Sequence, residues 1–322
     1  MLLALIVVRW LHLSASILLA SLFLFEAVIV APIVRNPSVA IGHLLGRIHR
    51  LACWAASWTL LVALLSWLGW GWLIASTMSG DDLIECLQTG DCLTVLTGTQ
   101  FGHIWLFRVI LSLVLGVGLW LLARTSRRRS YLQINLAGVS VIELVSLAWV
   151  SHAAADPVPL GIVHLLGDAL HLLGSAFWPG ALAPFAAFLL MLSKSGQVEA
   201  AEWAASVVRR FSASSLIAVA FMALTGLSNS IFMIGSIQAF LTSNYGQLLA
   251  SKVVLFFAMI GVGAWNLFLL KPRIAVDLPT VNVAQQKRAL RLLLRNVLWE
   301  IGLSTVVILI VGLLGITPPP SR

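Results

Sequence analysis

The chain has 322 residues, of which 60% are hydrophobic and only 10% charged, and its mean hydropathy is +1.00. A soluble core of this size cannot bury so much apolar sequence, so the composition excludes a soluble globular protein and predicts a polytopic membrane protein. The formal net charge of +8 does not indicate a nucleic-acid partner, because the cations lie in short loops between apolar runs, where membrane topology requires them.

Eight apolar runs reach about 20 residues, the length that crosses a bilayer as a helix. They cover 3–34, 51–78, 104–123, 133–152, 162–192, 212–235, 248–270 and 297–316. These runs predict an all-α polytopic membrane protein with eight transmembrane helices in a single membrane domain, 1–322. The first run has no basic leader and contains Arg9 and His12, so we expect a retained helix and not a cleaved signal peptide.

The loops predict the orientation of the chain. Most of the 20 Lys and Arg residues fall in alternate loops, at 35–50, 124–129, 194–210 and 271–295. By the positive-inside rule these loops are cytoplasmic, so both termini are expected outside.

The acidic loop from Asp81 to Asp91 is then expected outside, and it contains Cys86 and Cys92. An oxidising compartment favours a disulfide between the two cysteines. A metal site is less favoured, because two thiolates alone do not complete a zinc or copper shell.

An internal repeat relates the two halves of the chain. Phe101-Gly102 followed by Arg108 returns 144 residues later as Tyr245-Gly246 followed by Lys252. We expect two parallel four-helix repeats related by an axis along the membrane normal. The expected divisions are 1–130 with spans 1–3, 131–158 with span 4, and 159–322 with spans 5–8.

Four ionisable residues inside the apolar runs are the strongest candidates for a functional site, because an unpaired charge in hydrocarbon is costly. Asp168 and His171 lie on one helix face, and His152 ends the fourth span at the same, outer side. His12 corresponds to His171, since Arg9-Trp10-Leu11-His12 resembles Asp168-Ala169-Leu170-His171. We therefore predict metal ligation by His12, His152, His171 and Asp168.

Simpler roles remain open for two of these residues. His12 taken alone suits an interhelical hydrogen bond. Asp168 suits an ion pair with Arg9 or Arg108, or a supporting role in which its carboxylate orients His171.

Further residues are expected around this site. The outer cations Arg9, Arg108 and Lys252 suit lipid phosphates, neutralisation of Asp168 or the propionates of a haem. Trp178 continues the histidine stripe. His164 and His103 are further candidates for contacts around the site, although hydration at the interface is the simpler explanation for both.

A polar path toward the cytoplasm is expected to pass Glu143 and Glu26, for which interhelical hydrogen bonding is the simpler role. His43 and His49 are expected at the cytoplasmic surface, in the loop before the second span.

An ordered set of motifs extends over nearly the whole chain. It comprises Arg9-Trp10-Leu11-His12, Phe101-Gly102-x-x-Trp105-x-x-Arg108, Ser151-His152-Ala153, Asp168-x-x-His171, Trp178-x-Gly180, Arg210-Phe211-Ser212 and Tyr245-Gly246-x-x-Leu249-x-x-Lys252. This set resembles the CopD/PcoD copper-resistance family of bacterial inner-membrane proteins. The resemblance implies copper uptake or homeostasis across the inner membrane, often alongside a small periplasmic copper-binding partner, CopC.

The main hypothesis is therefore a copper transporter, with both termini periplasmic, that accepts copper at an outward-facing histidine cluster and passes it inward. Imidazoles suit copper but also other metals. We do not expect an enzyme, because the sequence has no Walker loop and no His-Glu-x-x-His helix.

Two alternatives stay open. Paired histidines with nearby cations also hold haem b, which would make the chain a transmembrane electron-transfer protein. The acidic loop from Asp81 to Asp91 would instead suit a membrane receptor that docks a periplasmic copper chaperone.

Overall fold

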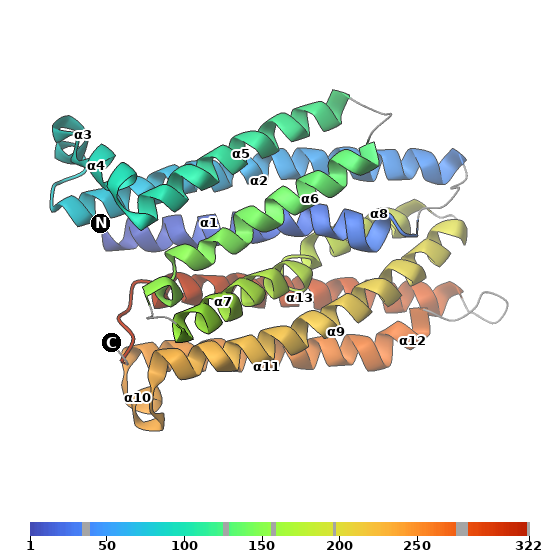
Figure 1. Ribbon diagram of the computed structural model, residues 1–322. Helices are drawn as coiled ribbons and strands as arrows, with labels where there is room; N and C mark the ends of the chain where they lie inside the picture. The colour runs from blue at the N-terminus through green and yellow to red at the C-terminus, as the bar shows by residue number, and fades with distance from the viewer. Residues whose placement is uncertain (34–38, 125–128, 156–158, 196–197, 275–282, 321–322) are drawn as a thin grey trace.

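The computed structural model describes residues 1–322 except 34–38, 125–128, 156–158, 196–197, 275–282 and 321–322. The described residues form helices, turns and bends without a strand. Eight helices of the described chain are long and apolar enough to cross a membrane, which confirms the predicted all-helical class and number of spans. They run side by side as one bundle, and the N- and C-termini lie at the same end of it (Figure 1).

The first four spans come from α1, α2, α5 and α6. The elements are α1 (Leu2–Leu24) with the π-helical η1 (Phe25–Val30), α2 (Val39–Ser79), α3 (Glu85–Thr89), α4 (Asp91–Gly98), α5 (Gln100–Arg124), α6 (Arg129–Val145), and the 3₁₀ turns η2 (Ser146–Val150) and η3 (His152–Ala155). The short α3 and α4 lie beside the ends of α2 and α5 at one end of the bundle (Figure 1).

The last four spans follow the same order of long helices. The elements are α7 (Leu160–Phe177), α8 (Leu182–Ser195), α9 (Val198–Ile234), α10 (Ile237–Thr242), α11 (Asn244–Trp265) with the π-helical η4 (Asn266–Leu270), α12 (Lys271–Ile274) and α13 (Val283–Leu314). The short α10 precedes α11 as α4 precedes α5.

The fifth span is broken, although the sequence predicts one continuous run over 162–192. It consists of α7 and α8, and Trp178 between them leaves helical geometry with φ −120° and ψ −79°. Pro179 explains the break, because the residue before a proline is pushed out of the α conformation. The break places the Trp178 side chain in the interior, where it is 3% exposed.

Three helices extend well beyond their predicted spans. We predicted starts at 51, 212 and 297, whereas α2, α9 and α13 begin at Val39, Val198 and Val283. The added turns contain arginines such as Arg50 and Arg210. Hydropathy locates the segment that fits the hydrocarbon layer, so it misses helical turns that project past it.

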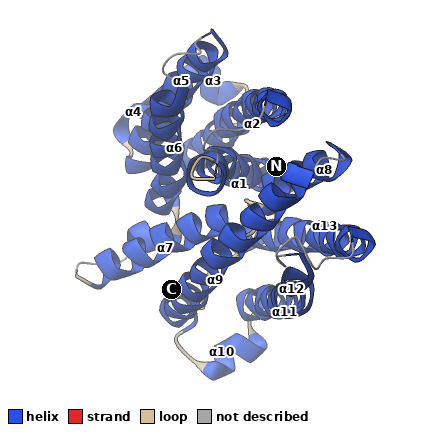
Figure 2. Cartoon of the chain, turned by 90° about the vertical axis from the view of Figure 1, so that its right-hand side faces the viewer, coloured by secondary structure: helices blue, strands red, loops and turns tan. Residues whose placement is uncertain are grey.

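The first helix is the most buried of the eight candidate spans and packs against α2, α6, α7 and α13. An end-on view shows α1 between the other helices (Figure 2). Apolar residues lie on every side of this helix, as expected for a helix surrounded by other helices. The polar residues of α1 therefore face neighbouring helices instead of lipid.

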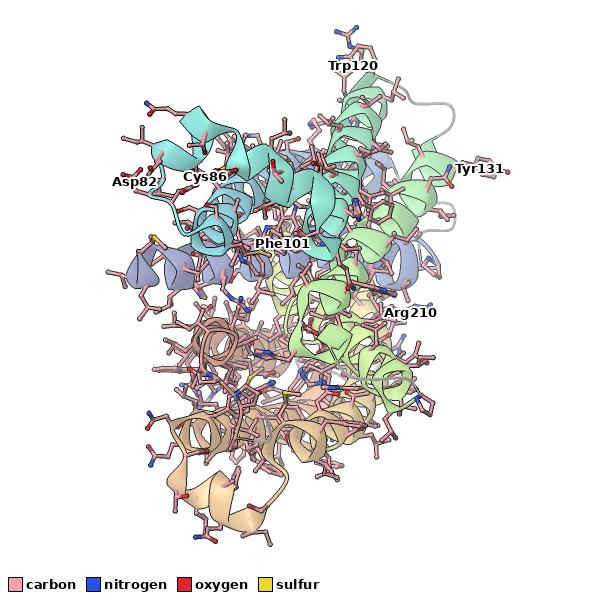
Figure 3. All side chains as sticks on the ribbon, turned by 60° about the vertical axis from the view of Figure 1, so that its left-hand side comes forward. Asp82, Cys86, Phe101, Trp120, Tyr131 and Arg210 are labelled. Atoms are coloured by element: carbon pink, nitrogen blue, oxygen red, sulfur yellow. A yellow bond between two sulfur atoms is a disulfide. The ribbon has the colours of Figure 1, made fainter. Side chains whose placement is uncertain are left out.

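The acidic loop carries a disulfide between Cys86 and Cys92, the pairing favoured over a metal site. The bond joins α3 to the start of α4. Asp82 and Cys86 lie at one end of the bundle, and Tyr131 and Arg210 lie at the other (Figure 3).

Candidate functional site

His12 is fully buried on α1, and both of its ring nitrogens have hydrogen-bond partners. Nδ1 lies 3.0 Å from the carbonyl oxygen of Ala63. Nε2 lies 2.7 Å from Nη2 of Arg108. Because a guanidinium group only donates, Nε2 accepts this hydrogen bond and Nδ1 carries the proton. The ring also stacks on Trp67, with centroids 4.7 Å apart.

Arg108 on α5 connects this histidine to α6. Its Nη1 donates to the carbonyl oxygen of Glu143 and, at 2.7 Å, to Oγ of Ser146. The Glu143 carboxylate lies 4.0 Å from Nη2 and accepts a hydrogen bond from Ser112 at 3.0 Å. Arg108 and Glu143 are 0% and 2% exposed, so the two charges compensate each other inside the bundle.

This first network holds four helices together and has no free nitrogen for a metal at His12. A guanidinium 2.7 Å from Nε2 also repels a cation electrostatically. Arg108 pairs with Glu143. This corrects one of our alternatives, in which Arg108 formed an ion pair with Asp168. A haem iron also needs a free ring nitrogen, so this arrangement gives no support to His12 as a haem ligand.

His171 occupies the corresponding place in the second half, but its two nitrogens differ. Nδ1 lies 3.0 Å from Oγ1 of Thr225, and the ring is also bonded to the carbonyl group of Met222. Thr225 donates its own proton to the carbonyl oxygen of Phe221, so Nδ1 of His171 is the donor to Thr225. The hydrogen bond to Thr225 occupies Nδ1, so Nε2 is the candidate metal-binding atom of this ring.

Asp168 lies one turn before His171, on the same helix. Its Oδ1 accepts a hydrogen bond from Asn229 at 3.3 Å, and the hydroxyl of Ser151 also donates to the carboxylate. The side chains of Lys252, His164 and His152 lie close enough to interact with its charge.

The region around Asp168 thus gathers one carboxylate, one ammonium and three imidazoles, of which His152 comes from η3 at the end of the first half. Asp168 and His171 are half-buried on α7, and His152 lies in η3, after the helix that we expected it to end. In the described part of the chain no group of three or more His, Cys, Asp or Glu side chains has the arrangement of a metal site. Ligation by His12, His152, His171 and Asp168 therefore stays a prediction.

The two halves repeat the histidine setting. His12 and His171 each bond to a carbonyl group and a hydroxyl side chain of the following long helix, Ala63 and Ser66 in one case, Met222 and Thr225 in the other. In the sequence, His171 follows His12 by the same number of residues as Met222 follows Ala63. The same offset separates Thr225 from Ser66.

The aromatic-Gly motif has a packing role. A Cβ atom at Gly102 would collide with the carbonyl group of Leu96, and one at Gly246 with that of Phe240. The two glycines therefore let the preceding short helix turn sharply into α5 and α11.

The remaining predicted residues have separate settings. Arg9 lies over the ring of Trp70 at 4.6 Å. His164 is buried and stacks on Phe232 at 4.6 Å, whereas His103 is exposed. Trp178 donates a hydrogen bond to Glu300 and does not extend the histidine group.

Sequence reasoning missed Glu300. Its carboxylate is buried and accepts hydrogen bonds from Trp178 and, at 2.7 Å, from Asn266. An acidic residue near the start of the last apolar run was the available signal.

The prediction for His49 was wrong. This residue is 8% exposed, and Nδ1 lies 2.7 Å from the carboxylate of Glu26. The reason is the early start of α2 at Val39, which places His49 within a helix facing α1 instead of in a surface loop. His43 is exposed, as expected.

Comparison with known proteins identifies similar sequences. The family model described as Copper resistance protein D-like, N-terminal domain, matches residues 1–162, and the model described as Copper resistance protein D matches residues 205–314. The chain is 29% identical over 249 residues to Copper resistance protein D of Pseudomonas syringae pv. tomato, which covers 77% of each chain.

Two further relatives are matched over shorter stretches. Inner membrane protein YebZ of Escherichia coli K12 is 27% identical over 56% of this chain and 58% of its own length. Copper transport protein CutJ of Bacillus subtilis 168 is 31% identical over 58% of this chain, but the match spans only 34% of that protein. No solved structure gives a significant match.

Proposed function

Because the chain belongs to the copper resistance protein D family, we propose that it accepts copper at the outer side of the bacterial inner membrane and passes it inward. The names of its relatives connect this family with copper resistance, copper transport and the inner membrane. Eight candidate spans agree with a multi-pass membrane protein. The positive-inside rule supports periplasmic termini, and the termini share one end of the bundle (Figure 1).

Nε2 of His171 carries the proposal. Nδ1–H is held by Thr225, so the ring is oriented with the lone pair of Nε2 ready for a metal. Metal-binding histidines are commonly held in this way by a hydrogen bond at the other nitrogen. Copper is then bound by His171, with Asp168 and His152 as the neighbouring donors, after these side chains draw together.

His12, the fourth predicted ligand, joins this site only if Arg108 moves away from its Nε2. The equal spacing of the two histidine settings supports an evolutionary pair of parallel four-helix repeats. In this pair the second half binds the cation, because Asp168 stands where the first half has Arg9. The first half keeps a neutralised Arg108–Glu143 pair.

The outer acidic loop supports a role for a partner. Asp81, Asp82, Glu85 and Asp91 surround the disulfide at the end of the bundle where the termini lie. We propose that a small periplasmic copper-binding protein docks there and delivers its metal to the region of His171.

Copper accumulation in cells tests the proposed function. Cells that express the chain should accumulate copper faster than cells with an empty vector, and His171→Ala or Asp168→Asn should remove most of the difference. His103→Ala is the matched control, because His103 is an exposed histidine at the same end. Equal accumulation in cells with the wild-type chain and with His171→Ala, at equal protein levels, would contradict the assignment.

A further inference from the structure

A group of one histidine, one cysteine and one glutamate lies at the other end of α1, where η1 meets α2. Nδ1 of His49 is 2.7 Å from Oε1 of Glu26, and Nε2 of the same ring is 3.4 Å from Sγ of Cys53. The side chains of His49 and Glu26 are 10% and 23% exposed. One imidazole therefore connects a carboxylate on one side with a thiol on the other.

Local structure produces this arrangement. His49 and Cys53 are one turn apart on α2, so both side chains lie on the same face of the helix. Glu26 belongs to the π-helical η1, and wide turns of this kind recur at functional sites. The polar face of α2 meets the only acidic residue of the first span.

The hydrogen-bond partners determine which ring nitrogen carries the proton. An ionised carboxylate accepts strongly, so Nδ1–H donates to Glu26. The amide nitrogen of Gln133 also lies near Nδ1, but at 3.2 Å it is the weaker competitor. Nε2 faces the Cys53 thiol at 3.4 Å, and its lone pair points at the sulfur once Nε2 is deprotonated.

Resting on the proposed function, we propose that this group is an inner copper site at which Cu(I) bridges Sγ of Cys53 and Nε2 of His49. The metal replaces the thiol proton and the proton on Nε2 of the charged ring, so an S–H bond and an N–H bond are lost, an S–Cu bond and an N–Cu bond form, and two protons are released to water. No electron is transferred. Glu26 holds the histidine in the tautomer that ligates, as carboxylates do for metal-bound histidines elsewhere.

The donor set selects the metal. Thiolates and thioethers are soft ligands that favour Cu(I), whereas carboxylates and water favour harder cations. The two atoms are now at hydrogen-bonding distance, and a small side-chain rotation makes room for an ion between them.

A cavity gives the metal access to this site. Its volume is about 590 Å³, and Glu26, His49 and Gln133 line it together with apolar side chains of α1, α2 and α8. The thioether-bearing Met191 also lines it, which adds a soft donor to the same space. By the positive-inside rule this end of the bundle is cytoplasmic, so the cavity lies where imported copper leaves the protein.

Thiol alkylation provides a direct test, because Cys53 is the free cysteine while Cys86 and Cys92 are bonded to each other. We would measure the rate at which a maleimide modifies the purified full-length chain in detergent, without reductant, before and after anaerobic addition of Cu(I) in acetonitrile. The proposal predicts that one equivalent of Cu(I) slows the modification by about tenfold or more. An unchanged rate would overturn it.

Variants separate the bridged site from a thiol that binds copper alone. Glu26→Gln keeps the volume of the side chain and should weaken protection by Cu(I) about tenfold. His49→Ala should weaken it further, and His43→Ala, an exposed histidine on the same helix, should leave it unchanged. Protection that is equal in His49→Ala and the wild type would refute the bridge, and Glu26→Gln decides the question if His49→Ala does not fold.

Copper uptake into sealed vesicles distinguishes this proposal from the proposed function. Protection of Cys53 without uptake by the wild-type chain would contradict transport and leave the inner site in place. Uptake that is normal in the wild type and unchanged in Cys53→Ser, without protection of the thiol, would remove the inner site and leave transport in place.

Discussion

Arg108 and Lys252 occupy corresponding places after an aromatic-Gly pair, yet only Arg108 engages a histidine directly. The guanidinium has enough donors to bond His12, Ser146 and the Glu143 carbonyl at once. An ammonium group has three donors and no planar fork, so it suits a looser site. Because of this difference, both ring nitrogens of His12 are occupied in the first half, whereas Nε2 of His171 is the candidate ligand atom in the second half.

The first prediction concerns the Arg108–Glu143 pair. Arg108→Leu leaves a buried carboxylate without its counter-charge and should lower the free energy of unfolding by about 3–5 kcal/mol. Glu143→Leu should have a similar effect, but the double variant should lose less than the sum, because both charges are then removed. Unfolding of the detergent-solubilised variants by a denaturing detergent measures these differences, and strictly additive losses would contradict the pairing.

The second prediction concerns Asp168. Asp168→Asn keeps the shape of the side chain but removes its charge, so the affinity of the outer site for copper should fall about 10-fold to 100-fold. Asn229→Ala removes only one hydrogen bond to the carboxylate and should have a smaller effect. Competition with a chromogenic copper chelator gives the affinities. An equal or larger loss in Asn229→Ala would show that Asp168 acts through packing and not through its charge.

At the scale of elements, hydropathy located the spans but not their true ends. The apolar runs predicted all eight helices, because each must hide its backbone from hydrocarbon. The turns of α2 before residue 51 are polar enough to look like a loop, so the sequence misplaced His49 and concealed its contact with Glu26. Pro179 indicates a helix break at Trp178, but the long apolar run on both sides led us to predict one continuous helix.

The third prediction tests the sharp turn into α11. Gly246→Ala places a Cβ atom against the backbone of Phe240, which cannot give way cheaply, so it should destabilise the protein by about 1–3 kcal/mol. Gly261→Ala is the matched control on the same helix. It meets no atom within 4 Å and should be neutral or stabilising by up to about 1 kcal/mol. Equal thermal stability of the two variants would argue against the role given to the aromatic-Gly motif.

At the scale of the whole molecule, the sequence predicted that ionisable residues gather in the outer half, but not which ones share a site. Periodicity placed Asp168 and His171 on one face of α7 because that relation lies within a single helix. The partners of His12 come from α2 and α5, and only the packing of the bundle reveals them. The resemblance to a copper family was carried by short motifs. The aromatic-Gly pair serves packing, whereas the histidine motifs place His12 in a hydrogen-bond network with Arg108 and His171 one turn after Asp168.

The fourth prediction concerns orientation. A reporter enzyme that is active only in the periplasm should be active when fused to either terminus. Both termini lie at one end of the bundle (Figure 1), and Arg210 lies at the other (Figure 3). A fusion within the loop after Arg124 should be inactive. If the loop fusion is active and both terminal fusions are inactive, the chain has the opposite orientation in the membrane. The proposed direction of copper movement would then be reversed.

The most direct test of the account is copper flux through the purified chain in sealed proteoliposomes, with copper supplied outside and no partner protein present. Wild-type vesicles should take up copper faster than protein-free vesicles, and vesicles with His171→Ala should lose most of that gain while those with His103→Ala keep it. Vesicles containing the folded wild-type chain that take up copper no faster than protein-free ones would contradict transport by this protein.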